Sequence, residues 1–195
     1  MVFMYIAKGD PEMDGSIAPC LCGAVLYGDG VNANAILECF AREQAARGYR
    51  VLGLIQRRAA EGRPCAGDVI LYDLGGDESF LISQRLGEGA SCCSVDPAGV
   101  AEASAVLRHA LAAPLDLLVV NKFGKLEAEG SGFLAEIMAA AARGVPVLTS
   151  VHHRHADRWA DFTGEFGTAI APDLRAIALW WRRTRNGAPG CFPAS

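Results

Sequence analysis

The sequence has no long apolar segment. A helix needs about 20 consecutive apolar residues to span a bilayer, and no run in this chain approaches that length. The N-terminal residues have neither the cationic start nor the long apolar core of a secretion signal. We therefore expect no membrane insertion and a cytoplasmic location.

Basic residues are also few. The net charge is -4, and the one dense basic stretch is Arg182-Arg183-Thr184-Arg185 near the C-terminus. Proteins that bind nucleic acids carry a basic patch that neutralises phosphates. The charge balance therefore argues against nucleic acid as a partner.

The seven cysteines form an odd set without the regular spacing of a disulfide framework. Cys20-x-Cys22 and Cys92-Cys93 could supply soft metal ligands, but neither has the C-x-x-C spacing of a zinc site. We expect reduced thiols that are buried or incidental.

Apolar residues, by contrast, are plentiful. They make up 51% of the 195 residues, and charged residues make up 21%. A chain of this size and composition can bury the core of one α/β domain. We predict an N-terminal extension over 1–19, a single domain over 20–186 and a C-terminal tail over 187–195.

The stretch around which the domain is organised runs from Leu115 to Val120 and ends in the polar turn Asn121-Lys122-Phe123-Gly124-Lys125. Residues 117–120 are all apolar, and such a run predicts a strand buried on both faces, as in a parallel sheet covered by helices. In such sheets ligands bind beyond the carboxyl ends of the strands. The turn after residue 120 is therefore the predicted site.

The remaining pattern alternates strands and helices. We expect strands over 23–27, 51–55 and 145–151, with Val25, Leu54 and Val147 on strands that neighbour the central one. Helices are expected from an apolar face at Ile36, Leu37 and Phe40, from the Asp96-Pro97 start, and over 133–141, 155–162 and 173–185.

Residues 69–74 and 79–83 flank a Gly-Gly-Asp-Glu turn, which predicts an inserted β-hairpin that decorates the main sheet. Alternating strands and helices imply parallel pairing through right-handed crossovers. The predicted fold is a three-layer α/β sandwich with a mainly parallel sheet.

A glycine loop follows the first predicted strand. Strand, loop and helix in that order are the context of a phosphate-binding loop. However, the spacing Gly23-x4-Gly28 is followed by Asp29-Gly30 where lysine and serine or threonine are needed. An ordinary turn between strand and helix is the alternative.

The central strand raises the same question. Nucleotide hydrolases usually carry a Mg²⁺-binding carboxylate at its end, whereas Asn121 and Lys122 stand here. Lysines at this edge suit direct contact with an anion; solvated turn residues are the alternative. The candidate anion- or nucleotide-binding residues are Gly28, Asp29, Gly30, Asn32, Arg57, Asn121, Lys122, Gly124 and Lys125.

Three further groups remain open. Glu127 and Glu129 could position water or a metal, or form a solvated first turn of a helix. His152, His153 and His155 could bind a metal, or be polar loop residues. Trp159, Trp180 and Trp181 fit a core or a subunit contact, which leaves a homo-oligomer open.

Several segments together resemble an uncharacterised bacterial family, a domain of unknown function often found beside molybdate-transport genes. They are 118–130, Ile82-Ser83-Gln84, 93–97 and Val147-Leu148-Thr149, and the likeness covers about residues 22 to 182. That family is distantly similar to thermophilic nucleoside-triphosphatases, whose central strand ends in an Asp-Glu-x-Gly-Lys turn. Gly124 and Lys125 match that turn, while Asn121 and Lys122 replace its two acids.

The resemblance implies a P-loop-like fold, and the replaced residues imply weak hydrolysis. We therefore expect an accessory protein that binds a small anion or a nucleotide, with a link to molybdate uptake or molybdenum metabolism. The ligand would be molybdate, or a nucleotide with Mg²⁺. A nucleoside-triphosphatase with an atypical loop, and a scaffold or regulatory protein with a vestigial site, are the alternatives.

Overall fold

The computed structural model describes residues 21–57, 69–85 and 93–186. The predicted extension over 1–19 and tail over 187–195 lie outside these ranges. None of the described helices is long and apolar enough to cross a membrane.

Seven strands form one sheet in the order β4-β3-β2-β7-β8-β1-β9. Their bounds are β1 Cys22–Tyr27, β2 Val51–Gln56, β3 Ile70–Asp73, β4 Ser79–Leu81, β7 Leu117–Phe123, β8 Val147–His152 and β9 Gly167–Ile170. Five strands from β2 to β9 pair in parallel, while β3 and β4 pair antiparallel at one edge. The mainly parallel sheet and the central place of β7 confirm the sequence prediction.

Two details of the predicted sheet were wrong. β8 lies between β7 and β1, so Val25 is not on a strand that neighbours the central one. The hairpin of β3 and β4 does not decorate the sheet but extends it, because β3 pairs with β2. Hydrophobic periodicity identifies strands and says nothing about which strands are neighbours.

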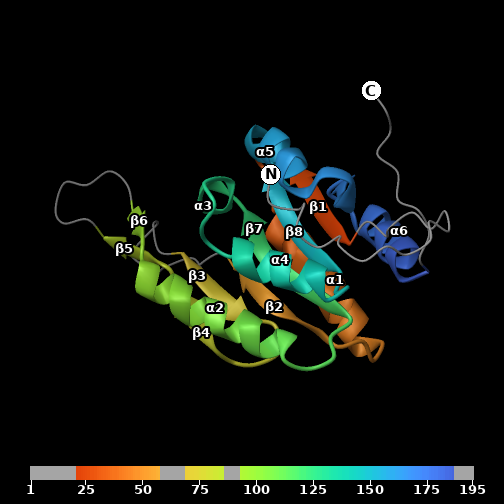
Figure 1. Ribbon diagram of the computed structural model, residues 1–195, viewed down its shortest axis with the longest axis horizontal. Coiled ribbons are helices and arrows are strands. Elements are labelled where there is room, and N and C mark those ends of the chain that lie inside the picture. The colour runs from red at the N-terminus through yellow and green to blue at the C-terminus, as the bar shows by residue number, and fades with distance from the viewer. Residues whose placement is uncertain (1–20, 58–68, 86–92, 187–195) are drawn as a thin grey trace, which may run out of the picture.

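Helices cover both faces of this sheet (Figure 1). Their bounds are α1 Ala33–Ala46, α2 Pro97–Leu111, α3 Lys125–Ala128, α4 Leu134–Ala142, α5 Ala156–Thr163 and α6 Leu174–Arg185, with 3-10 turns η2 His153–His155 and η3 Gly164–Phe166. One apolar core joins α2, α4 and α5 to the sheet, and the other joins α1 and α6 to the opposite face. The arrangement is a three-layer α/β fold.

Local sequence explains where the main helices begin. The Asp96 carboxylate accepts a hydrogen bond from the Ala98 amide, and Pro97 starts α2. Asp173 caps α6 in the same way through the Ala176 amide. Capping side chains satisfy N–H groups that have no partner inside the helix, so both predicted starts are confirmed.

The central strand β7 is buried because its side chains alternate between the two cores. Leu118 and Val120 belong to the core under α2 and α4, and Leu117 and Val119 belong to the core under α1. The strand does not stop at Val120 as predicted. It continues to Phe123 with a register irregularity between residues 120 and 123, so Asn121 and Lys122 are strand residues rather than turn residues.

Short elements escaped the sequence analysis. β9 is four residues long, and a separate two-stranded ribbon pairs β5 Ser83–Arg85 with β6 Cys93–Val95. Strands of three or four residues are too short to show a period. The ribbon nevertheless matters, because it lies near the carboxyl end of β7.

Chain direction creates a switch point between β1 and β8. From β1 the chain passes to α1 on one face, and from β8 it passes through η2 to α5 on the opposite face. The loops that leave these two neighbouring strands therefore diverge. In open α/β sheets a crevice of this kind is where ligands bind.

Candidate functional site

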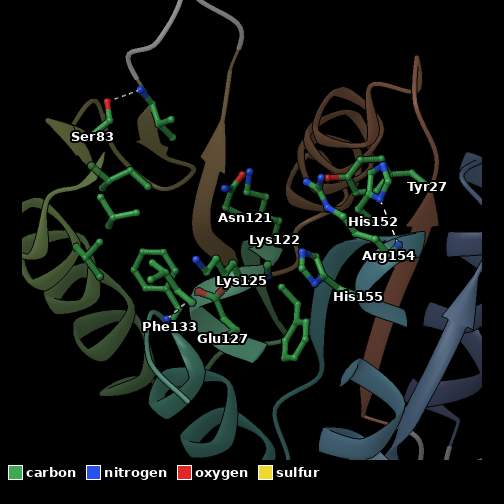
Figure 2. A pocket seen from close by; sticks show the side chains of 17 residues that line it. Tyr27, Ser83, Asn121, Lys122, Lys125, Glu127, Phe133, His152, Arg154 and His155 are labelled. Carbon is green, nitrogen blue, oxygen red and sulfur yellow. Dashed lines mark hydrogen bonds between the residues drawn. The ribbon is translucent and has the colours of Figure 1, made fainter. Parts of the chain in front are cut away.

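A cavity of about 260 Å³ lies at the carboxyl edge of the sheet, beside the switch point (Figure 2). It is bounded by the ends of β7, β8 and β1 and by the segment that contains β3 to β6 and the start of α2. Its lining residues are Tyr27, Val69, Ile82, Ser83, Val95, Val100, Asn121, Lys122, Phe123, Gly124, Lys125, Leu126, Glu127, Phe133, His152, Arg154 and His155.

Two lysines line this cavity, as the sequence predicted for the end of β7. The Lys122 side chain is exposed near the end of β7, and no ion pair of Lys122 is found in the described part of the chain. The Lys125 side chain is 79% exposed, and its Nζ lies 3.9 Å from a Glu129 oxygen. An exposed pair at that distance holds the lysine weakly, so both cations can contact a ligand.

Glu127 has a role that the sequence did not indicate. Its side chain is buried, Oε2 accepts a hydrogen bond from the Gly124 amide at 2.9 Å, and Oε1 accepts one from the Phe133 amide at 3.1 Å. The carboxylate therefore ties the start of α3 to the start of α4. It is not a solvated first-turn residue, whereas Glu129 is exposed beside Lys125.

Gly132 makes room for the Glu127 carboxylate that accepts these two hydrogen bonds. Its φ is +62°, and a Cβ added there would lie 2.1 Å from Oε1 of Glu127. A residue with a side chain would be strained by the backbone angle and would also displace the carboxylate. Glycine at this position is therefore required by the Glu127 geometry.

Asn121 is 3% exposed and is held by β2. Its Oδ1 accepts a hydrogen bond from the Gln56 amide at 2.8 Å, and its backbone carbonyl accepts one from the Ser150 hydroxyl at 3.1 Å. The side-chain oxygen thus continues the pairing of β2 with β7 past its regular end. The amide NH₂ group is a donor only, so Asn121 can offer donors, and no negative charge, to the cavity.

The turn after β8 supplies a cation and a histidine to the same cavity. Arg154 and His155 both line it, although the sequence analysis did not select Arg154. Burial and the nearby Arg154, His152 and Lys122 lower the pKa of His155, against a smaller raising effect of Glu127. Arg154 lies just past the end of β8, as Lys122 lies at the end of β7, and that signal could have identified it.

Tyr27 and His152 form the side of the cavity next to the glycine loop. Their rings meet edge to face with centroids 5.2 Å apart, and burial raises the Tyr27 pKa while Arg154 lowers it. The His152 Nδ1 accepts a hydrogen bond from the Arg154 amide, and Nε2 lies 3.2 Å from Oδ1 of Asp29. Since Nδ1 is an acceptor, Nε2 carries the proton and donates to Asp29.

Two internal hydrogen bonds order the glycine loop. The Asn32 side chain caps α1 by accepting from the Ala35 amide at 3.2 Å, and the Val31 amide donates to the Gly28 carbonyl. Gly30 has a φ of +82° and marks the turn. The loop therefore brings Asp29 to His152, and Asn32 serves the start of α1.

The suggested Gly23-x4-Gly28 spacing does not form a loop. Gly23 lies inside β1 and pairs with Leu148 and Thr168. A Cβ at this position would lie 2.6 Å from the Trp180 ring, so Gly23 makes room for α6 against the sheet. The spacing therefore reflects packing.

Arg57 is separated from the other predicted cations. Its guanidinium pairs with Glu38 at 3.0 Å and lies over the Tyr72 ring, 4.5 Å from the ring centroid. It lines a different depression, of about 550 Å³, beside the turn between β3 and β4. The structure therefore does not bring Arg57 to Lys122 and Lys125.

The acids of the site fit a magnesium ion poorly. In the described ranges no group of three or more His, Cys, Asp or Glu side chains could hold a metal. Both Glu127 oxygens accept backbone amides, and Asp29 pairs with His152. Mg²⁺ prefers oxygen ligands in octahedral geometry, whereas most of the charged side chains that line this cavity are cations. His153 is exposed and lines no part of the cavity.

The charged groups that line the cavity are mostly cationic. Lys122, Lys125 and Arg154 carry positive charge toward it, and Asn121 and Tyr27 add hydrogen-bond donors. Glu127 is the acid among its lining residues, and both of its oxygens are engaged. Such a set can hold a negatively charged group by charge-assisted hydrogen bonds.

A family model described as "Protein of unknown function (DUF2478)" matches residues 22–180. The chain belongs to this family. The match spans every element from β1 to most of α6, so the whole cavity lies within the family's domain.

One relative has a functional name. The chain is 38% identical over 170 residues to a protein of Bradyrhizobium diazoefficiens named molybdenum import ATP-binding protein ModC 2. The match covers 87% of this chain and 19% of that protein. The name therefore describes a much longer protein, and this chain spans about a fifth of its length. No solved structure matches the chain.

Proposed function

We propose that this chain is an accessory protein that binds an anionic group at the carboxyl edge of β7, with little or no hydrolysis. The observation that carries the proposal is the imbalance of charge at the cavity. Three cations face it, whereas the carboxylate of Glu127 is engaged by the amides of Gly124 and Phe133. The bound group is a small oxyanion or the phosphate of a nucleotide.

The link to molybdenum rests on the relative. That protein is named for molybdenum import and for ATP binding, and molybdate is a tetrahedral oxyanion that lysine and arginine can hold. Molybdate uptake or molybdenum metabolism is therefore the process that we assign to this chain. The same name supports a nucleotide as the second ligand class.

A P-loop-like architecture is the finer part of the proposal. The order of β1, a glycine loop and α1 supports it, as does a central strand whose end lies close to that loop. Hydrolysis is disfavoured because the loop has no lysine and because Asn121 stands at the end of the central strand. Phosphoryl transfer needs cations and usually Mg²⁺ held around the phosphates.

The test is calorimetric titration of molybdate, sulfate, phosphate and ATP into the wild type and the Lys122→Ala/Lys125→Ala variant. Each charge-assisted hydrogen bond contributes about 1.5–3 kcal/mol, so the double variant should lose at least tenfold in affinity. Arg175→Ala with Arg182→Ala is the matched control, since it also removes two exposed positive charges and neither residue lines the cavity. Unchanged affinity in the lysine variant would refute the site.

Hydrolysis is the rival function and has its own test. Mg²⁺-dependent phosphate release from ATP by the pure protein, lost in the Lys125→Ala variant, would establish a nucleoside-triphosphatase. We expect no release above the rate without protein. If no anion and no nucleotide changes the melting temperature, the protein is better described as a scaffold with a vestigial site.

A further inference from the structure

The cavity has two unlike sides. Its cationic side comes from β7, α3 and η2, as described above. Its other side is apolar and comes from the region of β3 to β6 and from the start of α2, with Val69, Ile82, Val95 and Val100 as lining residues. Figure 2 shows Ser83 and Phe133 on the side opposite Tyr27, His152 and Arg154, with Lys122 and Lys125 between them.

The apolar side is held in place by specific contacts. The Ser83 hydroxyl is buried and accepts a hydrogen bond from the Val69 amide at 2.8 Å. A Cβ at Gly99 would lie 2.0 Å from the Leu81 carbonyl oxygen, so glycine lets α2 pack directly on β4. The Asp96 amide donates to the Ile82 carbonyl. These contacts fix the apolar side of the cavity, which we call the apolar wall, relative to the hairpin of β3 and β4 and to α2.

The wall is not a closed part of the core. Val95 is 41% exposed, and Val69, Ile82 and Val100 are only partly buried. Exposed apolar groups that face a cavity gain free energy when an apolar surface covers them. A free oxyanion cannot provide such a surface, because it is hydrated and has no apolar atoms.

The size of the cavity leads to the same conclusion. A water molecule occupies about 30 Å³ in the liquid, and a tetrahedral oxyanion is only a few times larger. The cavity of about 260 Å³ leaves room for a ring-sized group beside the anion. The cations would bind one end of such a ligand, and the valines and isoleucine would bind the other.

We propose that the physiological ligand is an organic phosphate monoester with a ring-sized, largely apolar body, rather than a free oxyanion. Its phosphate lies at Lys122 and Lys125, and its body lies against Ile82, Val95 and Val100. This inference rests on the proposed function, since it assumes the anion site at β7. It assigns ligand selection to the region of β3 to β6 and to the start of α2.

Calorimetric titration of inorganic phosphate, methyl phosphate, phenyl phosphate and naphthyl phosphate tests the inference. Affinity should rise along this series in the wild type, and phenyl phosphate should bind about tenfold tighter than methyl phosphate, as expected when several carbon groups leave water. Val95→Ser should reduce that preference about threefold or more, because it removes apolar contact at an exposed position. Binding of inorganic phosphate should not change.

Leu81→Ser is the matched control, because Leu81 is 48% exposed in the same segment and does not line the cavity. Equal affinities along the wild-type series would overturn this inference and leave the anion site standing. An unchanged preference in Val95→Ser would also count against it. Failure of every phosphate to bind would refute both the inference and the proposed function.

Discussion

Two regions of the molecule looked alike in the sequence and differ in the structure. The loop after β1 and the end of β7 each follow a buried strand, and each carries polar residues suited to an anion. In the loop those residues already have partners: Asn32 caps α1, and Asp29 meets His152. At the end of β7 the acid is engaged, Lys125 has only a long contact with Glu129, and no ion pair of Lys122 is found among the described residues. Whether a motif can bind a ligand therefore depends on whether its side chains already have partners within the protein.

The largest effect is expected at Glu127, whose carboxylate distinguishes the end of β7 from the loop. Glu127→Ala would leave the buried amides of Gly124 and Phe133 without acceptors. An unsatisfied buried donor costs about 1–3 kcal/mol, so the free energy of unfolding should fall by about 2–4 kcal/mol. Urea denaturation measures this change.

Glu129→Ala is the control for that measurement, because its side chain is 60% exposed and its contact with Lys125 is long. It should change stability by less than about 0.5 kcal/mol. If Glu127→Ala were as mild as its control, Glu127 would be a solvated residue, as one interpretation of the sequence had it.

The sequence predicted the fold better than the strand order. The run before Asn121 and the Asp96-Pro97 start identified β7 and α2, because burial and capping leave local signals. The neighbours of β7 could not be predicted, because strand order is set by crossovers that leave no local mark. β9 was missed because a four-residue strand shows no period.

The site was only partly predictable, for a related reason. Lys122 was identified from its place at a strand end. Arg57 was selected on the same ground, but its side chain pairs with Glu38, nineteen residues earlier in the chain. The function of Glu127 depends on the chain turning back after Gly130 to bring the Phe133 amide within reach. Such partners are set by tertiary structure, so residue type and spacing cannot reveal them.

A smaller effect should appear in the pH dependence of anion binding. Burial and the nearby cations lower the pKa of His155, so the imidazole is neutral at neutral pH and in the free protein becomes charged only below its usual range. A bound anion stabilises the protonated form. Sulfate does not titrate between pH 5.5 and 7.5, so its affinity should rise a few-fold as the pH falls across that range.

His155→Gln should flatten this dependence, whereas His153→Gln should not, because His153 does not line the cavity. The same shift predicts an opposite trend for the stability of the free protein. The unfolded chain binds a proton at His155 more readily than the native state, so the free energy of unfolding should fall as the pH drops below about 6.5, the ordinary histidine pKa. Sulfate affinity that is flat with pH in the wild type would remove His155 from the site.

The smallest effect is expected in the glycine loop, and it tests the comparison from the other side. Asp29 is fully exposed, and its contact with His152 is the link between the loop and the end of β8. A fully exposed carboxylate is well screened by solvent, so Asp29→Asn should leave stability almost unchanged. Anion affinity at the β7 cavity should also stay within about twofold, because Asp29 does not line that cavity.

If the loop instead holds the phosphates of a nucleotide, removal of this negative charge would relieve repulsion, and ATP affinity would rise severalfold while phosphate affinity stayed constant. Titration of both ligands into the wild type and Asp29→Asn therefore decides whether the two regions act together or whether the end of β7 acts alone.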